Sequence, residues 1–301
     1  MNGTRVTSIL KWAGGKRRIA HFLSRFSPEI IDQYFEPFLG SGALFLYLAQ
    51  TKPRFRAVLS DSNNDLINVY KCVRDNVYDL IEALETHQYN YYGSPEEYYY
   101  YMRDVYRPAN DIENACRLLF LNKTCYNGLY RVNRSGSFNV PHGTYKNPVI
   151  CNRKKLQFFS EILRRTDADI ICSYYQHVTL GCRSGDFIYL DPPYFPMSKT
   201  SYFKDYTKDE FGCQEQTMLA KEFRRLNSIR CTVLLSNSNS PFIRDLYRGF
   251  NIITLSTIRP INCNASNRLR HQELLITNKK YQVKLEAEKP PSAREKSWKQ
   301  Q

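Results

Sequence analysis

The sequence predicts an α/β fold with an open, doubly wound sheet and an inserted helical segment. Six short apolar runs that end in turn residues are typical of strands, at residues 33–36, 57–60, 186–190, 231–236, 251–256 and 273–277. Helix-like stretches at 43–49 and 66–74 follow the first two, as in parallel βαβ units. From about residue 80 to 180 this alternation stops, and a tyrosine-rich and then basic segment replaces it.

Length and composition fit one large core with a smaller attached subdomain. The chain has 301 residues, of which 42% are hydrophobic and 14% aromatic. Residues 287–301 are rich in proline and charge and cannot bury enough apolar surface to order themselves. We therefore expect a disordered tail there.

The chain is strongly basic. Its 43 Lys and Arg against 29 Asp and Glu give a formal net charge of +14, which favours a polyanion or an anionic membrane as partner. No apolar run approaches the length of a membrane span, and the first residues lack the apolar stretch of a secretion signal. A soluble, cytoplasmic protein is the expectation.

Cysteine and histidine spacing predicts no metal site. The nine cysteines and five histidines are dispersed, with no Cys-x-x-Cys pair and no histidine at zinc-ligand spacing. Reduced, mostly buried thiols are expected.

Two glycines and an acid mark a candidate cofactor site. Gly40 and Gly42 follow an apolar strand and open a helix, where backbone and ligand approach closely, although a structural turn is an alternative. Asp61 ends the next strand, at the spacing at which a carboxylate meets ribose hydroxyls, and its alternative role is a helix N-cap. Together they indicate a nucleoside ligand. A single Gly-x-Gly, without the longer motif that a pyrophosphate needs, favours S-adenosylmethionine over NAD.

The tetrapeptide Asp191-Pro192-Pro193-Tyr194 indicates methyl transfer to an exocyclic amine. It stands directly after a strand, and a Pro-Pro turn with a core tyrosine is the alternative. The Asp191 carboxylate and the Pro192 carbonyl can accept both N–H bonds of the amine, which frees its lone pair and offsets the developing charge. Tyr194 offers a flat face for an extruded base. No Pro-Cys is present, so the cysteine nucleophile of carbon-5 cytosine methylation is not expected.

A basic stretch indicates nucleic-acid contact rather than a solvated surface. Residues 114–160 contain no acid, and their basic residues are Arg117, Lys123, Arg131, Arg134, Lys146, Arg153, Lys154 and Lys155. A second cluster, Arg259, Arg268 and Arg270, is a candidate phosphate contact or a solvated loop. Ser236 and Asn237 end a strand beside the expected pocket, and the sequence assigns them no role.

Taken together, these residues resemble the Dam-type DNA adenine methyltransferases, the D12 or alpha class. The resemblance covers about residues 8 to 278, and its motifs at 10–16, 36–42, 122–143 and 191–194 stand in the alpha-class order. It implies a Rossmann-like S-adenosylmethionine-dependent methyltransferase sheet with an inserted, mainly helical DNA-recognition domain that carries a β-hairpin. The expected division is a catalytic domain at 1–78 and 166–286, a target-recognition domain at 79–165 and the tail.

The resemblance also implies an activity and its partners. The protein would transfer a methyl group from S-adenosylmethionine to adenine N6 in double-stranded DNA, within GATC, by base flipping. It would be a monomer in the cytoplasm, associated with the nucleoid through DNA, without metal. Alternatives are a methyltransferase for RNA adenine or protein glutamine, and an inactive DNA-binding protein with this fold.

Finally, the resemblance implies roles for single residues. Cofactor contacts would come from Trp12, Lys16, Glu36, Phe38, Gly40, Gly42, Asp61 and Asp191. Lys11 would contact the first guanine, and Arg131 has the donor fork for guanine O6 and N7. Tyr126 would insert into the stack beside the flipped adenine, and Asn127 would occupy the place of the orphaned thymine. Leu129 and Pro141 would contact a thymine methyl, and Tyr145 would bind phosphate. Thr144 departs from the arginine of some relatives, which puts one backbone contact in doubt.

Overall fold

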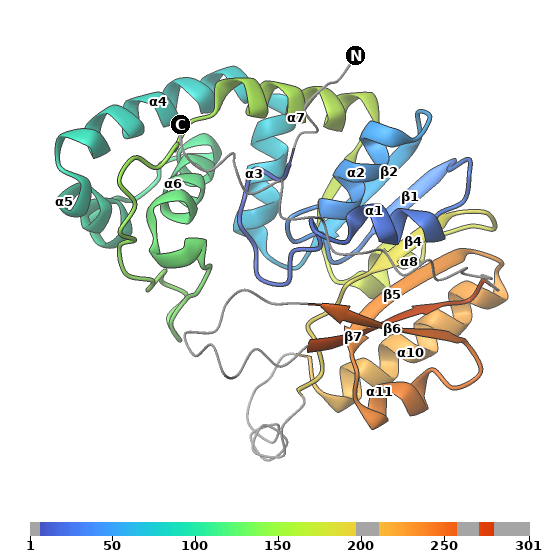
Figure 1. The fold of residues 1–301 in the computed structure, drawn as a ribbon. Helices are drawn as coiled ribbons and strands as arrows, with labels where there is room; N and C mark the ends of the chain where they lie inside the picture. Colours follow the sequence, from blue (N-terminus) through green and yellow to red (C-terminus); the bar gives the residue numbers. More distant parts are fainter. Residues whose placement is uncertain (1–6, 197–210, 258–270, 280–301) are drawn as a thin grey trace, which may run out of the picture.

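A seven-stranded sheet forms the centre of the molecule in the computed structural model, which describes residues 7–196, 211–257 and 271–279 (Figure 1). The strands run in the order β3-β2-β1-β4-β5-β7-β6. Neighbouring strands from β3 to β5 pair in parallel, and β7 is antiparallel to both β5 and β6. The bounds are β1 Gln33–Glu36, β2 Arg56–Asp61, β3 Asp169–Cys172, β4 Phe187–Leu190, β5 Thr232–Ser238, β6 Asn251–Thr257 and β7 His271–Thr277.

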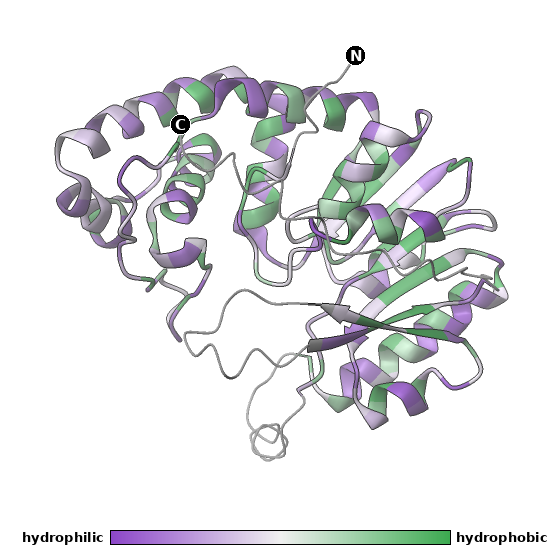
Figure 2. Cartoon of the chain, in the orientation of Figure 1, coloured by the Kyte–Doolittle hydropathy of each residue, from purple (hydrophilic) through white to green (hydrophobic). Residues whose placement is uncertain are grey.

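Helices cover both faces of this sheet. One face packs against α1 (Ala20–Leu23), α2 (Ala43–Thr51) and α3 (Asn64–Asp75), and the other against α8 (Tyr175–Thr179), α10 (Cys213–Ser228) and α11 (Pro241–Leu246). Successive strand residues point to opposite faces of the sheet, and each face has its own hydrophobic cluster. Tyr34 packs in the cluster on the first face and Phe35 in the cluster on the second. Burial on both sides explains the apolar runs of central strands such as β4 and β5, and Figure 2 shows β5 in the green of hydrophobic residues along much of its length.

The insert after α3 is helical, as expected. It contains α4 (Val77–Gly93), α5 (Pro95–Tyr100), a π-helical turn at Tyr101–Val105, α6 (Asp111–Thr124), a short 3₁₀ turn at Tyr126–Gly128 and α7 (Arg153–Arg165). Helices α6 and α7 pack on both α3 and α4, so the insert and the sheet share one hydrophobic cluster. Residues 79–165 therefore rest on the same framework that holds the loops after β1 and β2.

Two expectations about local structure need correction. The strand β3 was not predicted, because its four residues show no regular alternation of buried and exposed positions. The expected β-hairpin between 122 and 143 has no regular strands: two isolated antiparallel bridges, Cys125 with His142 and Val132 with Phe138, hold it instead. The six predicted strands are confirmed, with ends that shift by one or two residues.

Membrane and metal features can be stated for the described residues. No helix among them is long and apolar enough to cross a membrane. Within the same ranges, no group of three or more His, Cys, Asp or Glu side chains could hold a metal ion. The cysteines of these ranges are all free, and most are buried.

Candidate active site

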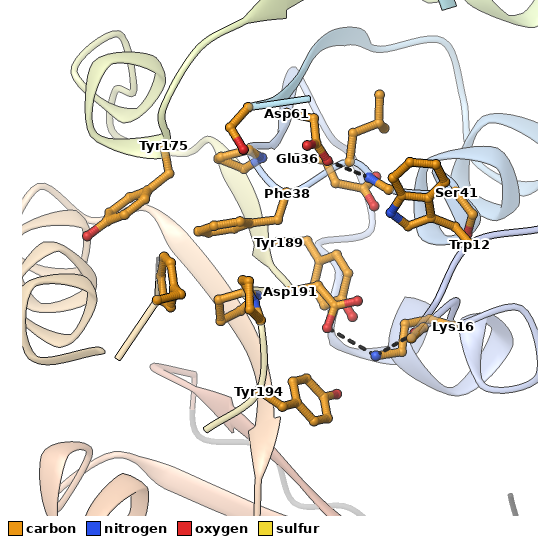
Figure 3. A pocket seen from close by; sticks show the side chains of 18 of the residues that line it. Trp12, Lys16, Glu36, Phe38, Ser41, Asp61, Tyr175, Tyr189, Asp191 and Tyr194 are labelled. Carbon is orange, nitrogen blue, oxygen red and sulfur yellow. Dashed lines mark hydrogen bonds and ion pairs between the residues drawn. The ribbon is translucent and has the colours of Figure 1, made fainter. Parts of the chain in front are cut away.

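A cavity of about 680 Å³ opens at the carboxyl ends of β1, β2 and β4 (Figure 3). Parallel strands end at one edge of a sheet, which is where ligands bind in this class of fold. The cavity brings together residues that are far apart in the sequence. Its lining includes Trp12, Lys16, Glu36, Phe38, Gly40, Asp61, Asp191, Pro192 and Tyr194.

Gly42 is the exception among the expected cofactor residues, because it does not line the cavity. Its φ of 60° is left-handed, and its N–H donates to the Leu39 carbonyl at 2.7 Å, which closes the turn before α2. Gly40, with a φ of 46°, does line the cavity. Gly40 therefore lies where a cofactor contact is predicted, whereas Gly42 shapes the turn.

Asp61 faces the cavity and is not a helix N-cap. Its Oδ2 accepts the Gly40 N–H at 3.0 Å and its Oδ1 accepts the Asn63 N–H at 3.0 Å. Asn63 itself caps α3, because its side chain accepts the Leu66 N–H at 2.9 Å. Burial raises the pKa of Asp61, and the two N–H donors oppose that rise. The acid thus ties the ends of β1 and β2 together while it lines the cavity.

Aromatic rings form the walls of the cavity. Phe38 stacks on Tyr175, with centroids 5.3 Å apart, and meets Phe211 edge-on at 5.6 Å. Trp12 closes the side next to the Gly40 loop (Figure 3). Flat apolar walls with an acid at one end suit a planar base attached to a ribose.

A buried carboxyl lies at the base of the cofactor loop. The Glu36 Oε2 accepts the Tyr34 hydroxyl at 2.9 Å and the Phe45 N–H at 3.2 Å. Burial raises the pKa of Glu36 to about 8, the Tyr34 hydroxyl opposes the rise, and the nearby Asp191 charge adds to it. At neutral pH this side chain is mainly a neutral acid, able to donate as well as accept a hydrogen bond.

Asp191 forms an ion pair with Lys16 on the opposite side of the cavity from Asp61 (Figure 3). The Lys16 Nζ lies 3.0 Å from Asp191 Oδ1 and also donates to the Gly14 carbonyl at 2.8 Å. Burial raises the pKa of Asp191, and the charge and hydrogen bond of Lys16 oppose the rise. The cation thus favours the charged form of this carboxylate at the cavity wall.

Tyr194 is fixed from two sides. Its hydroxyl donates to Glu273 Oε2 at 3.2 Å, and the Lys16 Nζ lies 4.7 Å from the centre of its ring. Burial raises the pKa of Tyr194, so its hydroxyl stays protonated. The tyrosine lines the cavity and is not a core side chain of a simple turn.

Two amides brace the 191–195 loop, and sequence reasoning missed both. The Gln216 Nε2 donates to the Pro193 carbonyl at 2.9 Å, and the Asn237 Oδ1 accepts the Phe195 N–H at 3.2 Å. The amides bond to each other, since Asn237 Nδ2 donates to Gln216 Oε1 at 2.9 Å. Both side chains are buried. The sequence assigns no role to Ser236 and Asn237, which lie near the end of β5. In the structure, Asn237 holds the 191–195 loop, and the Ser236 hydroxyl forms a hydrogen bond with the Tyr189 hydroxyl at 2.9 Å.

The N-terminal motif is joined to the recognition segment through Asn122. Its Oδ1 accepts the Lys11 N–H at 2.8 Å, and its Nδ2 donates to the carbonyls of Lys11 and Gly128. The Lys11 Nζ donates to the Tyr145 hydroxyl at 3.2 Å and lies over its ring. A Cβ on Gly128 would lie 2.3 Å from Lys11 Cδ, so only glycine permits this packing. Lys11 and Tyr145 therefore form one surface with the recognition segment.

The tip of this segment, where the sequence predicts DNA contacts, is exposed. The side chains of Tyr126 and Leu129 are 48% and 41% exposed, and Asn127 and Pro141 are exposed too. Asn127 has a left-handed φ of 55°, a conformation that asparagine adopts more readily than most residues. Three of these side chains stand on one turn, and Pro141 lies on the facing segment, where its carbonyl accepts the Tyr126 N–H at 2.9 Å.

Arg131 is exposed but engaged. Its Nε donates to Asn139 Oδ1 at 2.7 Å and its Nη2 to the Asn139 carbonyl at 3.0 Å. These two hydrogen bonds fix the guanidinium against the segment around Asn139. To bind both O6 and N7 of a guanine, Arg131 must give up at least one of its bonds to Asn139 or use its Nη1, which neither of these bonds involves.

Besides Arg131, three of the eight basic residues of the acid-free stretch bind protein groups, so the charge of this stretch is not all free for phosphate. Arg117 donates to the carbonyls of Met102 and Arg103, Arg153 pairs with Glu85 at 2.7 Å, and Lys155 donates to the Ser8 carbonyl. Lys123 is half-buried, and burial lowers its pKa to about 8. Exposed cations remain at Arg134, Lys146 and Lys154. The second cluster, Arg259, Arg268 and Arg270, and the tail lie outside the described residues.

Comparison with known proteins agrees with this geometry. A model of the D12 class of N6 adenine-specific DNA methyltransferases matches residues 12–261, which span the sheet from β1 to β6 and the Asp191 motif. The chain belongs to this class. It is therefore a DNA adenine methyltransferase, and S-adenosylmethionine is the methyl donor of the class. The alternatives of an RNA or protein glutamine methyltransferase and of an inactive DNA-binding protein are set aside.

Curated relatives are similar over nearly the whole chain. The Type II methyltransferase M1.LlaDCHI of Lactococcus lactis subsp. cremoris is 37% identical over 282 residues, 92% of this chain and 97% of the relative. The Type II methyltransferase M.MjaIII of Methanocaldococcus jannaschii is 40% identical, covering 91% and 99%. A DNA adenine methylase of Vibrio cholerae is 34% identical, covering 89% and 94%.

Proposed function

We propose that this DNA adenine methyltransferase acts on the adenine of GATC in duplex DNA, after rotating the base out of the helix into the cavity. The observation that carries the proposal is the Asp191 carboxylate, held by Lys16 at 3.0 Å beside the rigid Pro192 at the wall of a large cavity. An adenine inside a duplex cannot reach such a recessed carboxylate, so the base must leave the stack.

The cavity fits S-adenosylmethionine in size and in chemistry. Asp61 is placed to accept ribose hydroxyls, Trp12 and Phe38 offer faces for the adenine ring, and Lys16 offers a cation for the carboxylate end. Gly40, which has no side chain, lets the Trp12 indole lie directly against the loop at the cavity wall. When bound, S-adenosylmethionine supplies an electrophilic methyl group on a sulfonium. The chain's own residues orient the target amine toward it and exclude water.

Activation of the target amine falls to Asp191 and Pro192. The carboxylate and the Pro192 carbonyl would each accept one N–H, which turns the nitrogen lone pair toward the methyl group. Pro192 lines the cavity next to Asp191, as this role requires. Proline fixes the local backbone, and the Gln216 and Asn237 amides hold the rest of the loop. Tyr194 would stack on the base.

Recognition of GATC is supported by the segment that joins the insert to the cavity. Lys11 and Arg131 would contact guanines, and Tyr126 would fill the gap left by the flipped adenine, facing the orphaned thymine with Asn127. Leu129 and Pro141 would touch a thymine methyl, and Tyr145 a phosphate. The exposed, clustered placement of these side chains is the support for the assignment.

We further propose that residues 79–165 act as the target-recognition part of a monomer, with 1–78 and 166–286 as its catalytic part. The direct test of specificity uses expression in a host that lacks adenine methylation. Genomic DNA is then digested with one endonuclease that cuts only methylated GATC and one that cuts only unmethylated GATC. Resistance to the second and sensitivity to the first are expected. Unmethylated GATC with N6-methyladenine elsewhere would overturn the GATC assignment.

A further inference from the structure

Tyr130 is the inward-facing member of the recognition turn. Its neighbours Leu129 and Arg131 are exposed, whereas Tyr130 is half-buried and packs against the hydrophobic core. Its ring stacks on Trp12, with centroids 4.9 Å apart and planes inclined by 27°. A residue between two DNA-reading positions thus leans on a residue of the cofactor cavity.

Trp12 passes this contact to the cofactor loop. A Cβ on Gly40 would lie 3.0 Å from Trp12 Cδ1, so the indole rests directly on the loop backbone. Both backbone polar groups of Gly40 are hydrogen-bonded. Its N–H donates to the Asp61 carboxylate at 3.0 Å, and its carbonyl accepts the Tyr70 hydroxyl at 3.0 Å. Movement of Trp12 away from this loop would therefore alter the cavity wall.

The hydroxyl end of Tyr130 lies beside the start of α3. Burial raises the pKa of Tyr130, and the side chains of Asn63 and Asp65 also act on it. Asn63 caps α3 and donates its N–H to Asp61. A closed ring of contacts thus runs from Tyr130 through Trp12 and Gly40 to Asp61 and returns through Asn63.

We infer that Tyr130 is a positioning residue that makes cofactor binding and DNA recognition interdependent, an inference that rests on the proposed placement of both ligands. A cofactor stacked against Trp12 fixes the indole, which fixes Tyr130 and with it the backbone of Leu129 and Arg131. Because binding free energies are linked, DNA on the recognition turn must in return tighten the cofactor. Loss of one aromatic stack corresponds to a coupling of about 3- to 10-fold in affinity.

The test is a binding cycle with S-adenosylhomocysteine, which occupies the cofactor site without turnover. Its dissociation constant is measured by calorimetry with and without a duplex that the wild type methylates. The wild type should bind about 3- to 10-fold more tightly with the duplex. Tyr130→Leu should reduce this factor to nearly one, and Tyr130→Phe, which keeps the ring, should restore it. Tyr89→Leu, at a tyrosine that is 82% exposed on α4, is the matched control and should couple as the wild type does.

Steady-state kinetics add a readout that a merely structural role would not move. At saturating DNA, Tyr130→Leu should raise the KM for S-adenosylmethionine by about 3- to 10-fold while kcat changes less than about twofold. Full coupling in Tyr130→Leu, or none in an active wild type, would overturn the inference and leave the function intact. A wild type that methylates no DNA would instead contradict the function.

A measurement on the wild type keeps the inference testable if Tyr130→Leu does not fold. Hydrogen exchange of the peptides covering residues 126–143 is followed with and without S-adenosylhomocysteine. Added protection is expected, because the cofactor fixes the Trp12–Tyr130 stack. Unchanged exchange in this segment, with protection elsewhere in the cofactor site, would overturn the coupling.

Discussion

The ammonium of Lys16 lies 3.0 Å from the Asp191 carboxylate and 4.7 Å from the centre of the Tyr194 ring. One cation from the N-terminal motif thus contacts both functional side chains of the catalytic loop. In this position it stabilises Asp191 in the charged form that an amine donor needs. The N-terminal motif therefore tunes the catalytic carboxylate besides lining the cofactor cavity.

Lys16→Met should shift the acid limb of the pH–rate profile. Burial raises the pKa of Asp191 and Lys16 lowers it, so removal of the cation raises that pKa further. Because the carboxylate form is active, activity is lost as pH falls through this pKa, and the loss should occur at higher pH in the variant. The profile of kcat/KM for DNA measures the shift. Lys16→Arg should keep the wild-type limb, and an unshifted limb in Lys16→Met would contradict the role.

Asn237→Ala should slow chemistry without weakening cofactor binding. Loss of the amide frees the Phe195 N–H and leaves Gln216 without its partner, so the 191–195 loop is held less firmly. We expect kcat to fall by about 10- to 100-fold and the KM for S-adenosylmethionine to stay within about twofold, since small misplacements near the reacting atoms are costly. Asn239→Ala, at a half-buried amide whose hydrogen bonds with Gln272 and Arg244 lie outside the 191–195 loop, is the control. Equal kcat values for the two variants would argue against the brace.

Glu36→Gln should remove part of the pH dependence of stability. The folded protein raises the pKa of Glu36 to about 8 from an ordinary 4.5, so between these values the folded state holds a proton that the unfolded chain releases. Stability therefore declines as pH rises through this window, and glutamine, which does not ionise, escapes the decline. Urea unfolding at several pH values tests this. The free energy of unfolding of Glu36→Gln should increase relative to that of the wild type as the pH rises. A constant difference across the window would contradict the assignment.

Arg131→Ala and Arg134→Ala should separate base reading from phosphate contact. Loss of the Arg131 fork should cost about 10- to 100-fold in discrimination at one guanine. Arg134, an exposed cation at the hairpin tip, should weaken binding to all sequences and lower the salt slope of log K by about 1. Titration of duplexes with single guanine changes, at several salt concentrations, distinguishes the two. Equal loss on every sequence in Arg131→Ala would exclude its base contact.

The sequence predicted the elements that carry strong local patterns. Apolar strands such as 187–190, the Gly40 turn and the tetrapeptide that begins at Asp191 all follow from a few adjacent residues. The four-residue β3 carries no such pattern, and it exists because the edge of β2 offers its backbone a partner. The hairpin is similar, since its two bridges depend on the packing of Phe138 and the turn around Asn133.

The site was predictable in composition but not in its supporting contacts. Gln216 and Asn237 carry no motif, and their amides meet only because α10 packs beside β5. In the acid-free stretch, charge alone could not separate the exposed Arg134 from Arg117, which closes a helix end, or from Arg153, which pairs with Glu85. The charge of a region can indicate that it binds a polyanion. Which of its cations are free to make that contact is seen only in the structure.

The most direct test of the account compares wild type with Asp191→Ala on a duplex that contains one GATC. Purified protein and S-adenosylmethionine are incubated with it, and the nucleosides are analysed by mass spectrometry. The wild type should produce N6-methyladenine at that site, and Asp191→Ala should produce less than about 1% as much while retaining DNA binding. Comparable methylation by both proteins, or a methyl group on another atom, would contradict the central role of Asp191.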